Sequence, residues 1–366
     1  MDRISLLALH FIPGIGDYTI RQLISYCGSA EKVFQTPKGK LLKIPGIGSV
    51  TAESIIKGKP FQQAEKELKL AEKEKVSLLF YTDKNYPTRL KQIADAPSLL
   101  YVSGNIDFEN PKTVAIVGTR KSTDYGKNCV EELVEALVPH NALIISGLAY
   151  GIDIQAHKQA LKNQLSTLGV MGSGMDIIYP AAHRETAKKM LSLGGLVTEN
   201  AFGTKPDAHN FPARNRIIAG LADALVVVEA AEKGGALITA EIANSYNKDV
   251  FAFPGNIGQS YSHGCNNLIK ANKAHLLTSV KDLEYIMNWD VRSEPKKKIV
   301  LSLDAYGPSE QTVIKILLEN NNQLIIDELS WRSGLPISQL ASVLLGLEFQ
   351  NIITTLPGKI YRLVKP

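Results

Sequence analysis

The hydrophobic residues of this chain change their spacing twice, which divides the chain into three parts. From about Val76 to Asn288, short apolar runs alternate with segments in which apolar residues recur every three or four positions. The runs predict strands at Ser77–Tyr81, Leu99–Val102, Val114–Val117, Leu143–Ser146, Ser166–Met171, Leu196–Thr198, Ala224–Val228 and Val250–Phe253. Nearly continuous apolar strands separated by amphipathic helices indicate a parallel sheet covered on both faces. We expect an α/β fold over residues 76–290, with an extended Rossmann-like, doubly wound and mainly parallel sheet.

Residues 1–75 predict a helical domain that contains an internal repeat. The run Ile12-Pro13-Gly14-Ile15-Gly16 recurs as Ile44-Pro45-Gly46-Ile47-Gly48. This pattern is typical of helix-hairpin-helix motifs, in which glycines let the backbone approach a ligand and helix N–H groups donate to phosphate. Gly14, Gly16, Gly46 and Gly48 are therefore candidates for a secondary DNA contact. The alternative is that each hairpin only turns the chain between two helices.

Residues 299–366 follow a predicted linker at 291–298 and predict a winged helix. Helical spacing at Val313–Leu317, Asp327–Gly334 and Pro336–Phe349 precedes a hairpin of Ile352–Leu356 and Ile360–Val364. Pro336–Phe349 would be the recognition helix. Because its sequence is apolar where a DNA reader carries Arg, Asn or Gln, contact with protein is favoured over base readout.

Composition and charge narrow the class of protein. The chain of 366 residues is 45% hydrophobic and 21% charged, which is ordinary for a folded protein. A long apolar segment and a secretory leader pattern are both missing from the sequence, so we expect a cytoplasmic protein that does not enter the membrane. The cysteines Cys27, Cys129 and Cys265 lie far apart without CxxC spacing, which predicts neither a metal site nor disulfides.

The net charge of +5 is concentrated at the two ends of the chain. Residues 1–78 hold twelve Lys and Arg against eight Asp and Glu, residues 291–366 hold nine against seven, and the middle is left with about −1. A central domain that binds nucleic acid would therefore need a local basic pocket rather than a broad positive surface.

The stretch His209–Arg216 is the strongest candidate for such a pocket. Pro212 suits the first turn of a helix, so Arg214 and Arg216 fall near the helix N-terminus, where a cation opposes the macrodipole by roughly 0.3–1 kcal/mol. A bound phosphate would offset that cost, and Phe211 offers a flat face to a base. Other loops that follow strands carry glycine, hydroxyl or cationic residues, and ligands of doubly wound sheets bind at these strand ends. A GxGxxG motif followed by an acidic residue is missing, so no dinucleotide cofactor is expected.

Seven motifs, in order and spacing, resemble the DNA-processing protein A (DprA, also called Smf) family. They are VAIVGTR, SGLAYGIDIQAH, GSGMDIIYP, TEN followed by FPARNRIIAGLADALVVVEA, GGALITAEIA, VFAFPG and GCNNLI. The resemblance covers about residues 76–290. It implies a non-enzymatic protein that binds single-stranded DNA entering during natural transformation, protects it and loads the RecA recombinase onto it as a homodimer. Gly234-Gly235-Ala236 and Asn272 depart from the residues most frequent in the family.

The resemblance also implies a set of DNA-binding residues. Carried over by motif, they are Arg120, Ser146, Gly147, Gly172, Ser173, Gly174, Phe211, Arg214, Asn215 and Arg216. We add Lys121 and Lys205 from their charge and their proximity in sequence. Structural alternatives remain open for two of these residues: Arg120 could pair with Asp153 or Glu199, and Phe211 could belong to the core.

Three acidic residues and one histidine are better interpreted as structural residues than as catalytic or metal-binding ones. Asp153 and His157 lie one helical turn apart, but without a third ligand we interpret them as a helix N-terminal Asp and its local partner. Asp176 and Glu229 follow strands and are expected to organise loops by accepting backbone hydrogen bonds. No catalytic residue and no cofactor is predicted.

Two rival functions come from other classes of protein. Gly234–Glu241 resembles the PGGxGTxxE loop of nucleoside-monophosphate phosphoribohydrolases, although the spacing is one residue too long and Lys233 replaces the leading proline. In the second rival, the hairpins hold DNA and the central domain senses a free nucleotide. Release of free base would indicate the first rival, and stabilisation by nucleotides alone would indicate the second.

Overall fold

The computed structural model describes residues 3–289, 306–320, 322–350 and 352–364, so the predicted linker at 291–298 lies outside the described residues. The chain divides into two compact units, Met1–Val291 and Arg292–Pro366. The boundary predicted between residues 75 and 76 therefore lies inside one compact unit. Among the described residues, no helix has the length and apolar character needed to span a bilayer.

The larger unit is built around a nine-stranded sheet with the order β1-β2-β6-β5-β4-β3-β7-β8-β9. The strands are β1 (Ser77–Phe80), β2 (Leu99–Gly104), β3 (Thr113–Val117), β4 (Leu143–Ser146), β5 (Thr167–Val170), β6 (Gly195–Thr198), β7 (Ala224–Val227), β8 (Asp249–Ala252) and β9 (His275–Leu276). Strands β3 to β9 pair in parallel, whereas β1 with β2 and β2 with β6 are antiparallel. The predicted α/β class with a mainly parallel sheet is confirmed, and the two early strands extend the sheet at one edge as expected.

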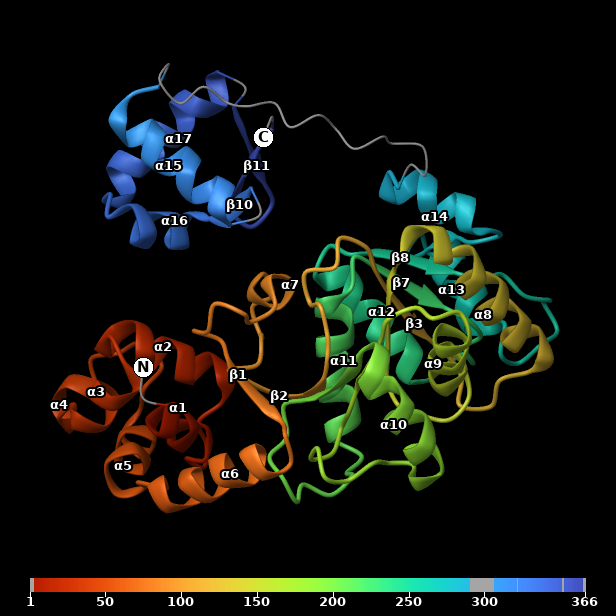
Figure 1. The fold of residues 1–366 in the computed structure, drawn as a ribbon, viewed down its shortest axis with the longest axis horizontal. Coiled ribbons are helices and arrows are strands. Elements are labelled where there is room, and N and C mark those ends of the chain that lie inside the picture. Colours follow the sequence, from red (N-terminus) through yellow and green to blue (C-terminus); the bar gives the residue numbers. More distant parts are fainter. Residues whose placement is uncertain (1–2, 290–305, 321, 351, 365–366) are drawn as a thin grey trace. The chain divides into compact units, whose positions relative to one another are not determined.

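Helices cover both faces of this sheet (Figure 1). They are α7 (Thr88–Lys91), α8 (Asp124–Ala136), α9 (Ile152–Lys162), α10 (Arg184–Leu193), α11 (Asn210–Leu221), α12 (Gly235–Ser245), α13 (His263–Lys270) and α14 (Val280–Met287), with short 3-10 turns at Val138–His140 and Ala181–His183. In β3, Val114 and Ile116 pack with α8, α9 and α14, while Ala115 and Val117 pack with α11, α12 and α13. Because side chains alternate along a strand and both faces are covered, every residue of β3 is buried.

Six helices precede the sheet and share a core with its antiparallel edge. They are α1 (Arg3–His10), α2 (Asp17–Cys27), α3 (Ala30–Gln35), α4 (Lys38–Leu41), α5 (Ser49–Lys57) and α6 (Phe61–Lys73). Leu7 and Leu23 of this helical part belong to the same buried cluster as Phe80 and Tyr101 of β1 and β2. Apolar burial therefore joins the helical part to the sheet, which explains why both fall in one unit.

The two predicted hairpins have the same backbone geometry. Gly14 and Gly46 adopt φ values of +78° and +79°, which favour glycine, and Gly16 and Gly48 are the N-cap residues of α2 and α5. The first hairpin joins α1 to α2 and the second joins α4 to α5. In both repeats a short hairpin therefore joins two helices, as the helix-hairpin-helix pattern predicts.

The smaller unit has the winged-helix elements expected from the sequence. It contains α15 (Pro308–Glu319), α16 (Ile326–Ser333) and α17 (Ile337–Phe349) with strands β10 (Gln323–Ile325), β11 (Ile353–Leu356) and β12 (Ile360–Leu363) in the order β10-β12-β11. Strand β10 was not predicted, because three residues are too few to show a period. Ile337, Leu345 and Phe349 of α17 are 54%, 54% and 79% exposed, so this helix presents an apolar surface.

Candidate nucleic-acid interface

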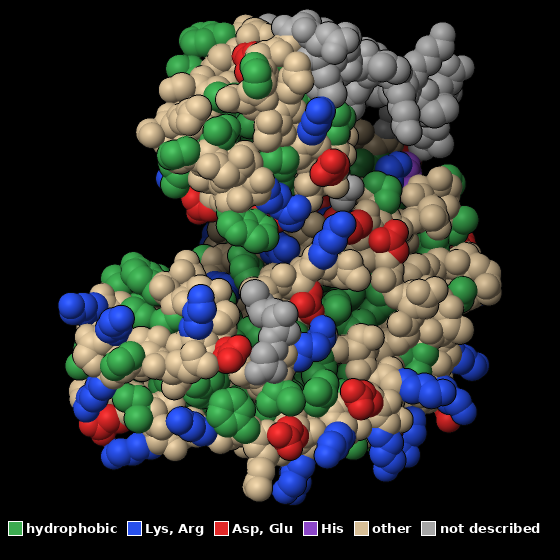
Figure 2. Space-filling model, turned by 60° about the vertical axis from the view of Figure 1, so that its left-hand side comes forward, with side chains coloured by type: hydrophobic (Ala, Val, Ile, Leu, Met, Phe, Trp, Pro, Cys, Tyr) green, Lys and Arg blue, Asp and Glu red, His purple; other side chains and the backbone are tan. Residues whose placement is uncertain are grey.

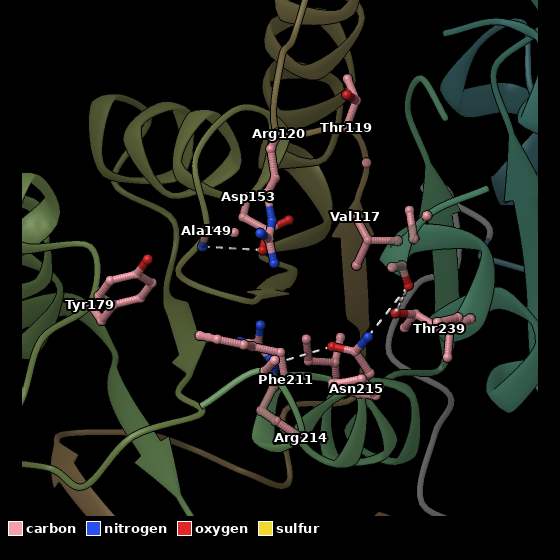
Figure 3. A pocket seen from close by; sticks show the side chains of 18 of the residues that line it. Val117, Thr119, Arg120, Ala149, Asp153, Tyr179, Phe211, Arg214, Asn215 and Thr239 are labelled. Atoms are coloured by element: carbon pink, nitrogen blue, oxygen red, sulfur yellow. Dashed lines mark hydrogen bonds between the residues drawn. The ribbon is translucent and has the colours of Figure 1, made fainter. Parts of the chain in front are cut away.

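A large open cavity of about 1260 Å³ lies at the carboxyl ends of the parallel strands (Figure 3). Its walls come from the loops after β3, β4, β5, β6 and β7. Strands β4 to β6 lie on one side of β3 and β7 to β9 lie on the other, so the cavity sits where the direction of winding reverses. This switch point is where doubly wound sheets bind ligands. We call it the main cavity.

Cationic side chains predominate in the main cavity. Its lining includes the cations Arg120, Lys121, Arg184, Lys205, Arg214 and Lys233 against the carboxylates Asp153 and Asp207. All of these cations except Arg214 are exposed to solvent. This cavity is therefore the local basic pocket that a central domain with little net charge would need to bind nucleic acid.

Arg120 and Phe211 approach each other from opposite sides of the main cavity (Figure 3). Arg120 follows β3, and its guanidinium carbon lies 5.7 Å from the centre of the Phe211 ring on α11. Among the described residues Arg120 forms no ion pair within 4 Å, although its charge acts to lower the pKa of Asp153. Phe211 is half-buried and lines the cavity, so it is not an ordinary core residue.

Tyr179 extends the aromatic surface beside Phe211. The two ring centres are 5.9 Å apart with an angle of 40° between the planes, and Tyr179 is 51% exposed. Tyr179, Arg184 and Lys233 also line the cavity, although the sequence did not predict them as site residues. The signal for Tyr179 is its place in the loop after β5, next to Pro180, where an exposed aromatic residue has no packing role.

Arg214 is buried in the wall of the cavity and is only 5% exposed. Its Nε donates to Asn215 Oδ1 at 3.2 Å, and a terminal nitrogen donates to the carbonyl of Val170. Burial lowers the pKa of this guanidinium, and the neighbouring carboxylate of Asp153 opposes that shift. Burial in turn raises the pKa of Asp153, while Arg214 acts to lower it. Arg214 therefore places a cation at the cavity wall, and the carboxylate of Asp153 partly balances its charge.

Arg216 lies outside the main cavity. Its guanidinium forms ion pairs with Asp17 of α2, at 3.1 Å, and with Glu199 after β6. All three side chains are at least four-fifths buried. Burial raises the pKa of Glu199 to about 7, although Arg216 acts to lower it. The sequence placed Arg216 among the DNA-binding residues; the structure instead places it in a buried link between the helical part and the sheet.

The predicted glycine and serine residues shape the site more than they line it. A Cβ on Gly147 would lie 2.3 Å from Asp153 Oδ2 and 2.6 Å from Arg214 Nη1, so glycine makes room for this charged pair. A Cβ on Gly172 would lie 3.0 Å from the Phe211 ring, and one on Gly174 would lie 2.5 Å from the carbonyl of Ala201. Ser146 Oγ donates to the Ile116 carbonyl at 2.6 Å, and Ser173 Oγ donates to the Ile177 carbonyl at 2.6 Å.

The predicted set is therefore only partly assembled in one place. Arg120, Lys121, Lys205, Phe211, Arg214 and Asn215 line the main cavity, and Gly172 lines a small extension of it beside Phe211. Ser146, Gly147, Ser173, Gly174 and Arg216 do not line it.

Asp153, Asp176 and Glu229 have the structural roles expected of them, whereas His157 is not the partner of Asp153. Asp153 Oδ2 accepts from the Ala149 N–H at 3.3 Å, Asp176 accepts from Gly203 N–H at 2.9 Å, and Glu229 accepts from Thr123 N–H at 2.9 Å. His157 contacts Thr167 Oγ1 and the Gly147 carbonyl, each at 2.7 Å, and burial lowers its pKa to about 4. In the part of the chain that the structure describes, no group of three His, Cys, Asp or Glu residues could hold a metal ion.

The two hairpins differ in their surroundings despite their shared geometry. Asp17 begins α2 in the first hairpin, and its carboxylate accepts from Ser98 N–H at 2.7 Å as well as from Arg216. The second hairpin carries exposed Lys40, Lys43 and Val50 instead.

In the face of the larger unit shown in Figure 2, many Lys and Arg side chains reach the surface, with hydrophobic and acidic side chains between them.

Comparison with known proteins places this architecture in a family. The family model described as DNA recombination-mediator protein A matches residues 77–288, and the model of the DprA winged helix domain matches residues 308–359. Protein Smf of Synechocystis is 36% identical over 76% of this chain and 70% of its own length. DNA processing protein DprA of Streptococcus pneumoniae is 41% identical over 55% of this chain and 71% of its own length.

Two solved structures share the fold. The X-ray structure of DprA from Streptococcus pneumoniae superposes with a TM-score of 0.68 at 32% identity, and covers 78% of this chain and 98% of that one. DprA from Helicobacter pylori, whose structure concerns its single-stranded DNA binding mode, superposes with a TM-score of 0.53 at 29% identity. That match covers 59% of this chain and 96% of the Helicobacter chain.

Proposed function

The chain belongs to the DNA recombination-mediator protein A family, and from this premise we propose that it binds single-stranded DNA in the main cavity as a non-enzymatic recombination mediator. The observation that carries the proposal is that six cations line the same cavity as the half-buried ring of Phe211 and the exposed ring of Tyr179. Cations that follow a phosphate backbone, together with aromatic stacking platforms, are the usual means of holding single strands without sequence preference. The single-stranded DNA binding described for the Helicobacter pylori relative supports the same assignment.

The exposed cations Arg120, Lys121 and Lys205 would hold successive phosphates. The free N–H groups at the start of α12, where a Cβ on Gly234 or Gly235 would meet no neighbour, provide a further anion position. One base would stack on the aromatic surface that Phe211 and Tyr179 form together. Arg214 and Asn215 would complete the wall, while Gly147, Gly172 and Gly174 keep the backbone close enough for the charged groups and the rings to approach the strand.

The wider role that we propose is in natural transformation. The protein would cover incoming single-stranded DNA in the cytoplasm, protect it and help to load RecA. A homodimer would present two such cavities to one strand, and the second cavity would then bind at a high effective concentration. The DNA processing relatives of Streptococcus pneumoniae and Bacillus subtilis support this wider role.

The phosphoribohydrolase alternative finds no support at its acidic residue. Glu241 corresponds to the last residue of the resembling loop, yet it is absent from the cavity lining and pairs with Lys273 Nζ at 2.7 Å. We expect that incubation with nucleoside monophosphates releases no free base.

Salt-dependent binding of an oligonucleotide tests the proposal. We expect the logarithm of the affinity for oligo-dT to fall with the logarithm of salt concentration by roughly 0.7 per phosphate contacted. Replacing both Arg120 and Lys205 by Ala should reduce that slope and weaken binding at least tenfold, which is about 1.4 kcal/mol or more. Lys188→Ala with Lys189→Ala on α10 is the matched control, because it removes the same charge and both lysines are exposed and lie outside the cavity lining. Affinity that is insensitive to salt, or equal for the double variant and the control, would refute the site.

A further inference from the structure

A second cavity of about 580 Å³ opens where β7 and β8 end. Its walls include Thr123, Tyr125, Glu229, Asn256, Gln259 and Tyr261. Tyr261 also lines the main cavity, so the two cavities are neighbours that share one aromatic side chain. We call this the amide cavity. The proposed function does not use it.

The charge of the amide cavity is opposite to that of the main cavity. Among the described residues that line it there is no Lys or Arg, and the only charged side chain is Glu229. A phosphate group would meet a carboxylate here without a compensating cation, which disfavours it. A neutral group with hydrogen-bonding edges fits the lining better.

Hydrogen bonds hold the wall of the amide cavity in place. The side-chain amide of Asn266 accepts from Gly255 N–H at 3.1 Å and donates to the Gly255 carbonyl at 2.8 Å. The carbonyl of Tyr261 accepts from Ala230 N–H at 2.7 Å, which ties the loop after β8 to the end of β7. The cavity is therefore formed in advance of any ligand, as binding sites generally are.

Unused hydrogen-bonding capacity faces this cavity. The exposed side-chain amides of Asn256 and Gln259 form no hydrogen bond with any described residue. The carboxylate of Glu229 accepts from Thr123 N–H and from Thr123 Oγ1, and two carboxylate oxygens have about four acceptor positions in total. The lining thus offers two amides that both donate and accept, one carboxylate that only accepts, and the rings of Tyr125 and Tyr261.

We propose that the amide cavity takes one unstacked nucleobase of the strand whose phosphates lie in the main cavity, and that a base with an exocyclic amino group binds better than thymine. Amide side chains pair with base edges through one donor and one acceptor. Glu229 can only accept, so it favours the amino group of cytosine, adenine or guanine over the carbonyl of thymine. Tyr261 lines both cavities, so the base would pass this ring where it turns away from the neighbouring bases of the strand. This inference rests on the proposed function, since it needs a strand in the main cavity.

Oligo-dC and oligo-dT of about twelve nucleotides separate this inference from the proposed function. Both stack weakly, and they differ at the position where cytosine carries an amino group and thymine a carbonyl. We expect the full chain to bind oligo-dC about five- to tenfold more tightly than oligo-dT at neutral pH. Fluorescence anisotropy at a fixed salt concentration measures both affinities.

Glu229→Gln, whose amide can donate as well as accept, should bind the two oligonucleotides equally. The double variant Asn256→Ala with Gln259→Ala should lose affinity for both oligonucleotides and still bind oligo-dC more tightly. Gln63→Ala, which removes an exposed amide on α6, should keep the preference for oligo-dC. Because the two loop amides are exposed and unbonded, we expect the double variant to unfold at the same temperature as the parent. Equal affinity of the parent chain for oligo-dC and oligo-dT would overturn the inference and leave the proposed function standing. Failure to bind either oligonucleotide would overturn both.

Discussion

Arg214 and Arg216 lie two positions apart on α11, yet their side chains enter opposite surroundings. Arg214 points to the cavity wall near Asp153, whereas Arg216 pairs with Asp17 and Glu199 on the other side of the helix. Residues two positions apart on a helix do not face the same way, so one helix can serve a ligand and a structural link with the same residue type. A cation near a helix start is therefore evidence for a ligand only when the face of the helix is known.

The largest expected effect comes from removing the buried ion pairs of Arg216, the structural side of this comparison. Arg216→Ala leaves Asp17 and Glu199 buried without their cation. We expect the free energy of unfolding to fall by about 3–5 kcal/mol, because an uncompensated buried charge is costly. Urea titration of the full chain measures this change, and Lys188→Ala provides a surface control.

Affinity for oligo-dT should meanwhile change little in the folded fraction of Arg216→Ala, because Arg216 does not line the main cavity. A variant that kept its stability but lost DNA binding would place Arg216 on the strand after all.

On the ligand side, we expect Tyr179 to make the largest single contribution to the affinity for single-stranded DNA. Tyr179→Ala removes a half-exposed ring beside Phe211, and we expect the affinity for single strands to fall by about 1–3 kcal/mol. Tyr179→Phe keeps the ring and should bind as the parent does. If both variants lost affinity equally, the hydroxyl rather than stacking would be responsible.

A pH-dependent effect on stability belongs to the structural side of the comparison alone. Burial raises the pKa of Glu199 from 4.5 to about 7, so the folded chain binds a proton there that the unfolded chain releases between these values. Since the folded state holds more protons in this window, stability contributed by Glu199 falls as pH rises from about 4.5 to 7. Glu199→Gln should flatten that part of the stability profile in urea titrations at several pH values. An unchanged profile would show that Glu199 titrates normally in the folded chain.

The sequence predicted the elements that rest on local periodicity better than those that rest on distant partners. Strand β4 was predicted at its observed bounds, Leu143–Ser146, because a buried parallel strand is a continuous apolar run. The ion pair between Arg216 and Asp17 joins residues 199 positions apart, so no local sequence pattern predicts it. Strand β9 escaped prediction because its two residues, His275 and Leu276, are exposed. At the site, charge and glycine predicted the loops of the main cavity, but only the fold separates residues that line it from residues that support it.

The smallest expected effect concerns the two hairpins of the helical part. They too differ in that one has a structural link and the other has exposed cations. The first hairpin uses Asp17 to join the sheet, while the second leaves Lys40 and Lys43 exposed. If the second hairpin contacts a DNA backbone, replacing both lysines by Ala should weaken binding of long oligonucleotides by about 0.5–1 kcal/mol and lower the salt slope.

Lys66→Ala with Lys69→Ala on α6 removes the same charge from an exposed helix and is the matched control. Short oligonucleotides that fill only the main cavity should not distinguish these double variants. Equal losses for both double variants would indicate a general effect of net charge and assign both hairpins a purely structural role, because a specific contact depends on position whereas a diffuse field does not.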